Sequence, residues 1–66
     1  MKTYVKNLDE VKETIENLVK ENNGHQEKTN DRCDCGESAG IRVFNKNLDI
    51  VAIFVECELC VNHYEN

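Results

Sequence analysis

The sequence lacks several features that would stabilise a small protein. It contains no Trp, and only 39% of its 66 residues are hydrophobic. A domain of this length buries only about 60% of the surface that its unfolded chain exposes. We therefore expect a single domain with a marginal hydrophobic core, which needs a further stabilising element.

Long apolar segments are missing as well. The longest uninterrupted apolar run, residues 50–55, has six residues, whereas a membrane-spanning helix needs about 20. Residues 1–6 contain no hydrophobic stretch of the kind found in signal peptides. The sequence therefore predicts a cytoplasmic protein with no membrane partner, in a reducing compartment where disulfides rarely persist.

Positive charge is scarce, and no catalytic motif has a credible scaffold. Eight Lys and Arg residues face thirteen Asp and Glu residues, a net charge of −5. This balance disfavours nucleic-acid binding, which depends on basic surfaces. The combination of His25, Glu27, Cys57 and Cys60 mimics a zinc deaminase motif, but 66 residues cannot supply a nucleobase pocket. We expect a protein that is not an enzyme.

The first third of the chain predicts an amphipathic helix. Asn7 is a suitable N-cap, and the segment Asn22-Asn23-Gly24 supplies a left-handed residue to end the helix. We therefore expect a helix over residues 8–22 within an N-terminal segment 1–24, preceded at Tyr4 by an extended stretch or a first turn. Apolar residues recur at steps of three and four through this segment: Leu8, Val11, Ile15, Leu18 and Val19.

The rest of the chain predicts a connector followed by a hairpin module. Residues 25–32 contain no apolar side chain, which is typical of an exposed polar connector. Residues 41–44 and 50–55 are rich in strand-forming residues and flank turn residues, which predicts a β-hairpin. Residues 58–64 have room for two turns of helix. We expect residues 33–66 to form one module within a single domain.

Four cysteines form two pairs at opposite ends of the predicted hairpin. The pairs are Cys33 with Cys35 and Cys57 with Cys60. Folding the hairpin brings the pairs together, so that four thiolates can converge as tetrahedral zinc requires. Gly36 suits the tight turn after the first pair. The pattern predicts one structural Zn²⁺ per chain, and a shell of four cysteines leaves no coordination position for catalysis.

Other interpretations of the cysteines stay open. Disulfides between the pairs are geometrically possible, and four thiolates can also bind iron. His63 follows Cys60 by one helical turn, so it could replace Cys33 or Cys35 as a ligand. His25 lies in the polar connector, where solvation is the simpler interpretation. A thiol-redox or metal-handling role for the second cysteine pair is a further alternative.

The order of knuckle, hairpin, C-x-x-C and helix from Cys33 onward resembles a treble-clef zinc finger. It is similar to the fingers of DksA/TraR-type RNA polymerase modulators, the zinc-binding domain of Clp unfoldases and small zinc anti-sigma factors. This resemblance covers about half the chain, and it implies a small zinc-stabilised α+β domain with the four cysteines as ligands. It also implies a regulator of the transcription machinery or of a protein-handling machine, with RNA polymerase or a regulator as partner. The C-x-C pair and the long apolar hairpin depart from the DksA/TraR pattern, as does the absence of its acidic tip motif.

The second strand of the hairpin points to a partner surface. Residues 50–55 are apolar on both faces, and one helix can cover only one of them, so the other face is suited to a protein partner or a homodimer. The alternative is that the terminal helix with Tyr64 covers the second face. A nucleic-acid-binding zinc ribbon is the alternative function. The candidate partner-binding residues are Phe44, Ile53 and Val55 on the hairpin, and Glu13 and Glu16 on the helix.

Overall fold

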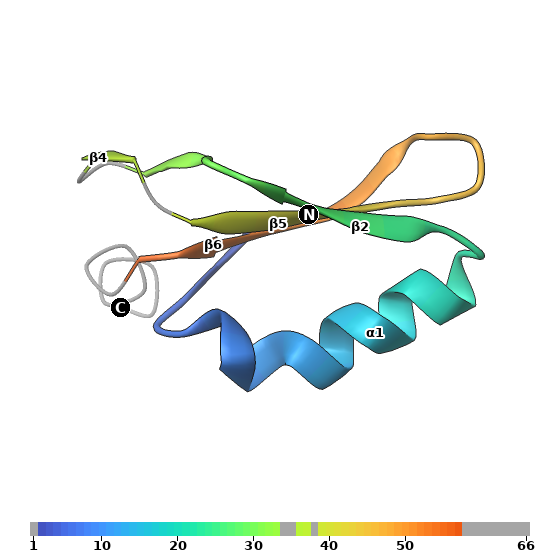
Figure 1. Cartoon of the computed structure of the whole chain (residues 1–66), viewed down its shortest axis with the longest axis horizontal. Coiled ribbons are helices and arrows are strands. Elements are labelled where there is room, and N and C mark those ends of the chain that lie inside the picture. The colour runs from blue at the N-terminus through green and yellow to red at the C-terminus, as the bar shows by residue number, and fades with distance from the viewer. Residues whose placement is uncertain (1, 34–35, 38, 58–66) are drawn as a thin grey trace.

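A computed structural model describes residues 2–33, 36–37 and 39–57 of the chain. Within them, one α-helix lies against one face of a mixed four-stranded sheet, which makes the fold α+β (Figure 1). The elements are β1 (Lys2–Val5), η1 (Leu8–Val11), α1 (Lys12–Glu21), β2 (His25–Thr29), β3 (Arg32–Cys33), β4 (Gly36–Glu37), β5 (Gly40–Phe44) and β6 (Ile50–Glu56).

The helix predicted over residues 8–22 is confirmed, and its first turn is the 3-10 helix η1. Asn7 is extended and caps this turn, because its Oδ1 accepts a hydrogen bond of 2.9 Å from the backbone N–H of Asp9. At the other end, Asn23 adopts the left-handed conformation with a φ of 50°. No helix in the described part of the chain has the length and hydropathy to cross a membrane.

The sheet has the strand order β1-β6-β5-β2, so β6 lies in its interior. The predicted hairpin is confirmed, since β5 and β6 pair antiparallel. Strand β1 pairs parallel with β6, with Tyr4 opposite Val55. The extended alternative for the residues before the helix is therefore the correct one.

The prediction of a polar connector over residues 25–32 is wrong for its first five residues. His25 to Thr29 form β2, which pairs antiparallel with β5 along its whole length. The first four of these side chains are exposed, and β2 lies at the edge of the sheet. Backbone pairing with β5 outweighs a weak strand preference here, as is common for strands whose side chains pack little.

The hydrophobic core lies between α1 and the sheet. Its buried residues are Ile15 from the helix, Val43 from β5, and Ala52 and Phe54 from β6. A second, smaller cluster at the far end of β6 contains Val55 and Cys57. This small core agrees with the marginal stability expected from the sequence.

The face of the sheet opposite α1, which we call the outer face, has no helix over it in the described residues (Figure 1). Lys2, Ile53, Arg42 and Glu27 form one cross-strand row on this face, one residue from each strand. The outer face is thus mixed in character, because Ile53 lies in this row between the charged residues Lys2 and Arg42, with Glu27 at the β2 edge. The alternative cover by Tyr64 lies outside the described residues.

The hairpin turn, residues 45–49, is held by bonds within the turn itself. Asn45 Oδ1 accepts hydrogen bonds from the backbone N–H groups of Asn47 at 2.8 Å and Asp49 at 3.0 Å. Leu48 has a φ of 68° and is 71% exposed. A bulky residue is uncommon in this left-handed conformation, so the turn places an apolar side chain in solvent at some conformational cost.

Gly24 is required by close packing between the helix and β5. A Cβ atom at this position would lie 1.6 Å from the backbone oxygen of Phe44. We expect Gly24→Ala to lower the free energy of unfolding by about 2 kcal/mol or more, because backbone must shift to admit the methyl group. Asn23→Gly is the matched control, and it should be neutral or stabilising because it relieves a positive φ. Urea unfolding of both variants measures the difference, and equal stabilities would contradict this account.

Candidate metal centre

The first predicted cysteine pair begins on a tight two-stranded ribbon. Strand β3 pairs antiparallel with β4, which places Cys33 opposite Gly36. The Cys33 thiol donates a hydrogen bond of 3.2 Å to the backbone oxygen of Gly36. Gly36 has a φ of 129°, a conformation that L side chains rarely adopt. The requirement for glycine that the sequence predicts after the first cysteine pair is confirmed.

The second pair begins directly after β6, where a backbone hydrogen bond positions Cys57. Its N–H donates to the oxygen of Val5 at 2.8 Å, and the N–H of Glu56 donates to Ala39 at 2.9 Å. The Glu56 carboxylate accepts a bond of 3.0 Å from the backbone N–H of Leu8. Segments from both halves of the chain therefore position Cys57, which is 6% exposed.

The fold brings Cys33 and Cys57 to the same place. Cys33 packs against the buried cluster of Val55 and Cys57, together with Tyr4 and Ile53. One cysteine of each predicted pair thus reaches one cluster, through the closure of the hairpin and the pairing of β1 with β6.

The remaining predicted ligands, Cys35, Cys60 and the alternative His63, lie outside the described residues. Among residues 2–33, 36–37 and 39–57, no three metal-binding side chains form a cluster. This part of the chain contains only two of the four predicted cysteine ligands. His25 lies at the other end of β2 from the segment that leads into Cys33. It stacks on Phe44 at 5.0 Å between ring centroids, at the end of β5 that leads into the hairpin turn.

A polar network fixes the segment that leads into Cys33. Asp31 accepts a bond of 2.6 Å from Nη2 of Arg42 and a second bond from the Thr29 hydroxyl. Arg42 holds the pKa of the Asp31 carboxyl below its usual range, mainly through this hydrogen bond. Gly40 lies next to the Asp31 carboxylate and leaves room for it, since a Cβ at residue 40 would come within 2.8 Å of Asp31 Oδ2. The network anchors the start of the ribbon to the outer face of the sheet.

Sequence reasoning missed this network because its members are polar residues of ordinary types. Asp31 lies in a segment with no apolar residue, and nothing in a single sequence pairs it with Arg42. Thr29, Asn30 and Asp31 are residue types that favour turns, which indicates a turn here but not the partner of Asp31.

The candidate partner-binding residues fall into two groups. Phe44 and Ile53 are half-buried on the hairpin, and Glu13 and Glu16 are exposed on α1. Val55 has no exposed surface, because Tyr4, Cys33 and Ile53 pack around its cluster. In the single chain, Val55 therefore supports the cysteine end of the sheet, and its part in partner binding stays a prediction.

Comparison with known proteins adds no relative. The chain matches no family model, no curated protein and no solved structure. The resemblance to treble-clef fingers therefore depends on the cysteine spacing and on the order of elements, without a relative to support it.

The Asp31 network generates a test of how the ribbon is anchored. Asp31→Asn should lower the Tm by about 5 °C or more, because it removes the charge from a buried group that accepts two hydrogen bonds. Asp49→Asn, an equivalent change at an exposed carboxylate of the hairpin turn, is the matched control and should leave the Tm almost unchanged. Thermal unfolding followed by circular dichroism measures both, and a similar Tm for the two variants would show that the network contributes nothing.

Proposed function

We propose that this protein is a small, non-enzymatic, zinc-stabilised domain that acts in the cytoplasm by binding another protein. The observation that carries the proposal is the meeting of Cys33 and Cys57 in one cluster. These two cysteines are far apart in sequence and each is the first of a closely spaced pair, which supports a site in which both pairs supply ligands. In a treble-clef arrangement, Cys35 and Cys60 complete the shell.

The surroundings of the two thiols suit zinc. The two described donors at this cluster are thiols, which are soft ligands and favour zinc or iron over magnesium or calcium. Bound zinc would join the ribbon, the end of β6 and the chain that follows. It would supply structural stability, since a shell of four cysteines has no open position for a substrate.

The outer face supports binding to protein. Ile53 and Phe44 are half-buried apolar residues on a face with no helix over it in the described part of the chain. The four charges there, Lys2, Arg42, Glu27 and Asp31, are balanced in sign. Aromatic residues such as Phe44 and the residue type of Arg42 are enriched at protein interfaces, whereas a nucleic-acid site requires an excess of positive charge. A regulator of transcription or of a protein-handling machine agrees with this proposal.

The first test of the proposal is the metal content. Protein purified under reducing conditions should contain one equivalent of zinc, and removing it with a strong chelator should unfold the cysteine end, because structural zinc contributes about 10–16 kcal/mol in small fingers. Cys33→Ser, Cys35→Ser, Cys57→Ser and Cys60→Ser should each weaken zinc binding, while His63→Ala and His25→Ala should not. Elemental analysis and competition with a zinc indicator measure this.

Two results would contradict the metal assignment. Less than half an equivalent of zinc in reduced protein would exclude a resident metal. Release of zinc by His63→Ala, together with no effect from one of the cysteine variants, would replace a cysteine by His63 in the shell. Zinc lost to mild oxidant and regained on reduction would favour the thiol-redox alternative.

The second test concerns the outer face. Ile53→Asp should weaken a partner complex at least about tenfold, or dissociate a homodimer, because a charge replaces an apolar contact. Because Ile53 also packs against the cluster of Val55 and Cys57, zinc content and the amide NMR spectrum are measured on the same variant, and only a folded variant that keeps its zinc tests the outer face. Leu48→Asp makes a similar change at the exposed turn and should have no effect. Glu13→Gln and Glu16→Gln should mainly slow association.

Capture from native cytosol, compared between the wild type and these variants, measures partner binding, and analytical ultracentrifugation measures the homodimer. Equal capture by the wild type and Ile53→Asp would exclude the outer face. Tighter binding to DNA or RNA at physiological salt than to any retained protein would favour the nucleic-acid alternative.

A further inference from the structure

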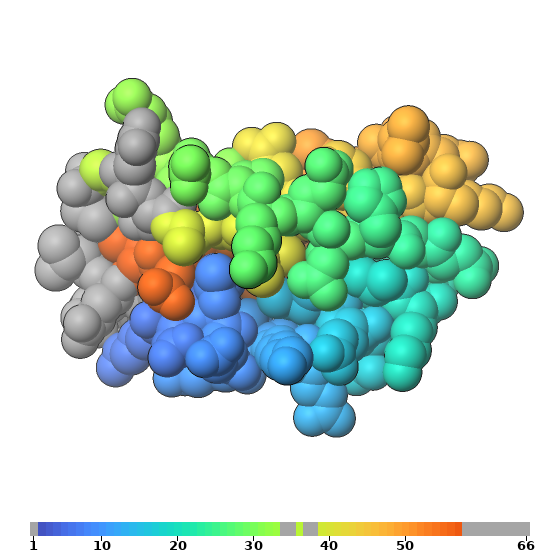
Figure 2. All heavy atoms as spheres, in the orientation of Figure 1, coloured from blue at the N-terminus to red at the C-terminus, as the bar shows by residue number. Residues whose placement is uncertain are grey.

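Strand β2 is an open edge of the sheet. It pairs with β5 on one side, and no described strand pairs with its other side. Among the described residues, the backbone groups of residues 25–29 that point away from β5 have no hydrogen-bond partner. Figure 2 shows this side of the molecule, with the green residues of β2 above the blue and cyan residues of the helix. An edge of this kind can accept one more strand.

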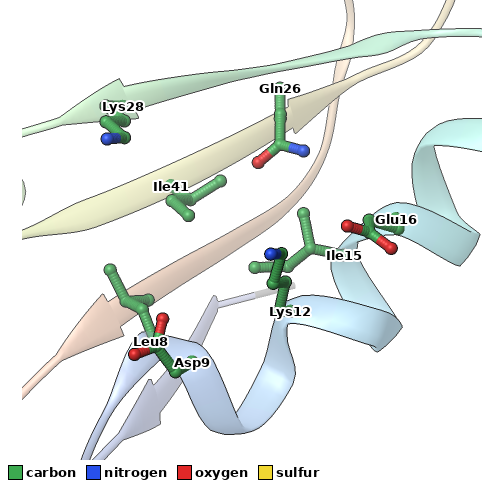
Figure 3. Close-up of a pocket in the computed structure, with 8 residues that line it drawn as sticks. All are labelled: Leu8, Asp9, Lys12, Ile15, Glu16, Gln26, Lys28 and Ile41. Atoms are coloured by element: carbon green, nitrogen blue, oxygen red, sulfur yellow. The ribbon is translucent and has the colours of Figure 1, made fainter.

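A groove runs beside this edge, between β2 and the helical segments. Leu8, Ile15 and Ile41 give it an apolar lining (Figure 3). In Figure 3, Leu8, Lys12 and Ile15 point up from the helical segments, and Gln26 points down from β2. The groove lies where two helical segments pack on different strands, since η1 contacts β1 and β6, whereas α1 contacts β5 and β2.

The groove has two lobes that follow the strand. The first, of about 250 Å³, is lined on β2 by Gln26 and Lys28. The second, of about 260 Å³, is lined by Lys28, Thr29 and Asn30. Leu8, Lys28 and Ile41 border both lobes, so the two are adjacent. Lys28 stands between them, with one lobe on either side along the strand.

This spacing matches an added strand. Alternate side chains of a strand point to the same face, about 6.6–6.8 Å apart. In an added strand that continues one residue past the end of β2 at Thr29, the residues opposite Gln26, Lys28 and Asn30 would all point to the groove side. The outer two can extend into the two lobes, while the middle one faces the Lys28 ammonium. The first lobe is also lined by Asp9, Lys12 and Glu16, so its charges are balanced, and Lys28 is the charge that borders both lobes. The groove therefore fits an apolar residue, an acidic residue opposite Lys28 and a second apolar residue at alternate positions.

A second copy of this chain is a poor occupant of the edge. Antiparallel pairing of β2 with itself requires that residues directly opposite each other share a face. The register centred on residue 27 places Glu27 opposite Glu27, and the register centred on residue 28 places Lys28 opposite Lys28. Like charges directly opposite each other are destabilising. The register centred on Gln26 avoids this but pairs only residues 25–27 within the strand.

We propose that the groove between α1 and β2 binds an extended peptide segment of another protein, which adds to β2 as a fifth, antiparallel strand. The segment carries apolar side chains for the two lobes and a carboxylate opposite Lys28. This inference rests on the proposed protein-binding role, and it uses a different surface from the outer face. It does not depend on which ligands hold the metal.

Two synthetic peptides test the proposal on the full chain, purified under reducing conditions. Both are acetylated and amidated: Leu-Thr-Asp-Thr-Leu, and Leu-Thr-Lys-Thr-Leu as its matched control. We expect the wild type to bind the Asp peptide about tenfold more tightly than the Lys peptide, because the central residue changes from attraction to repulsion. The net charge of −5 favours the Lys peptide, so this preference would have to come from the local pair.

Variants of the protein reverse the preference or leave it unchanged. Lys28→Glu should favour the Lys peptide, while Lys46→Glu, the same change in the hairpin turn, should keep the preference for Asp. Amide NMR shifts should map to residues 25–30 and to Leu8 and Ile41. N-methylation at successive peptide positions should abolish binding at every second position, since alternate N–H groups of an added strand face β2.

Three outcomes would overturn the proposal: equal affinity for the two peptides, NMR shifts on another surface, or N-methylation effects without alternation. A dimer of the chain that protects the β2 amides without peptide would also overturn it, because a second copy would then occupy the edge. These outcomes are independent of the zinc content and of the effect of Ile53→Asp, so failure here is distinguishable from failure of the proposed function.

Discussion

The structure depends on the pairing of β6 with a strand on each side. Strand β6 lies between β1 and β5, so the strand near the end of the described chain is paired directly with the strand at its beginning. Its Ala52 and Phe54 side chains complete the core under α1, and Val55 supports the cysteine end. The backbone of Cys57 is bound to Val5. The helix has no complete surface to pack on until β6 is in place, so the fold depends on contacts between distant parts of the chain.

The two hydrophobic clusters contribute unequally to the stability of the fold, because they bury different numbers of apolar residues. The cluster under the helix has four buried residues and a ring of half-buried aliphatic side chains around them. The cluster at the cysteine end has two buried residues, Val55 and Cys57. Apolar burial alone gives little stability there, since each buried aliphatic side chain contributes about 1.5–3 kcal/mol. The Asp31 network and the proposed metal both act at this weaker end, where covalent and polar bonds can replace missing apolar surface.

The parts of the fold that could be predicted from sequence are those with a strong pattern of hydrophobicity. The helix over residues 8–22 repeats its apolar residues at the helical period. The hairpin has two runs of strand-forming residues with turn residues between them. Closing the hairpin predicts that the two cysteine pairs converge, and of these the described Cys33 packs against the cluster that contains Cys57. Strand β2 could not be predicted, because it is entirely polar and owes its conformation to pairing with β5. Asp31 was missed for a related reason, since its partner Arg42 becomes a neighbour only when β2 and β5 align. The groove arises from the angle of the helix across the sheet, which one sequence does not encode in any local pattern.

The hairpin turn has a practical consequence for protein engineering. Its hydrogen bonds join Asn45 to residues of the same turn, and it lies at the opposite end of β6 from Cys57. Lengthening a flexible loop costs little, about 0.6 kcal/mol for each doubling of its length. Between Lys46 and Leu48 the chain should therefore accept a fluorescent reporter or an affinity epitope, which would allow the protein to be followed in cells with both the outer face and the β2 edge left uncovered.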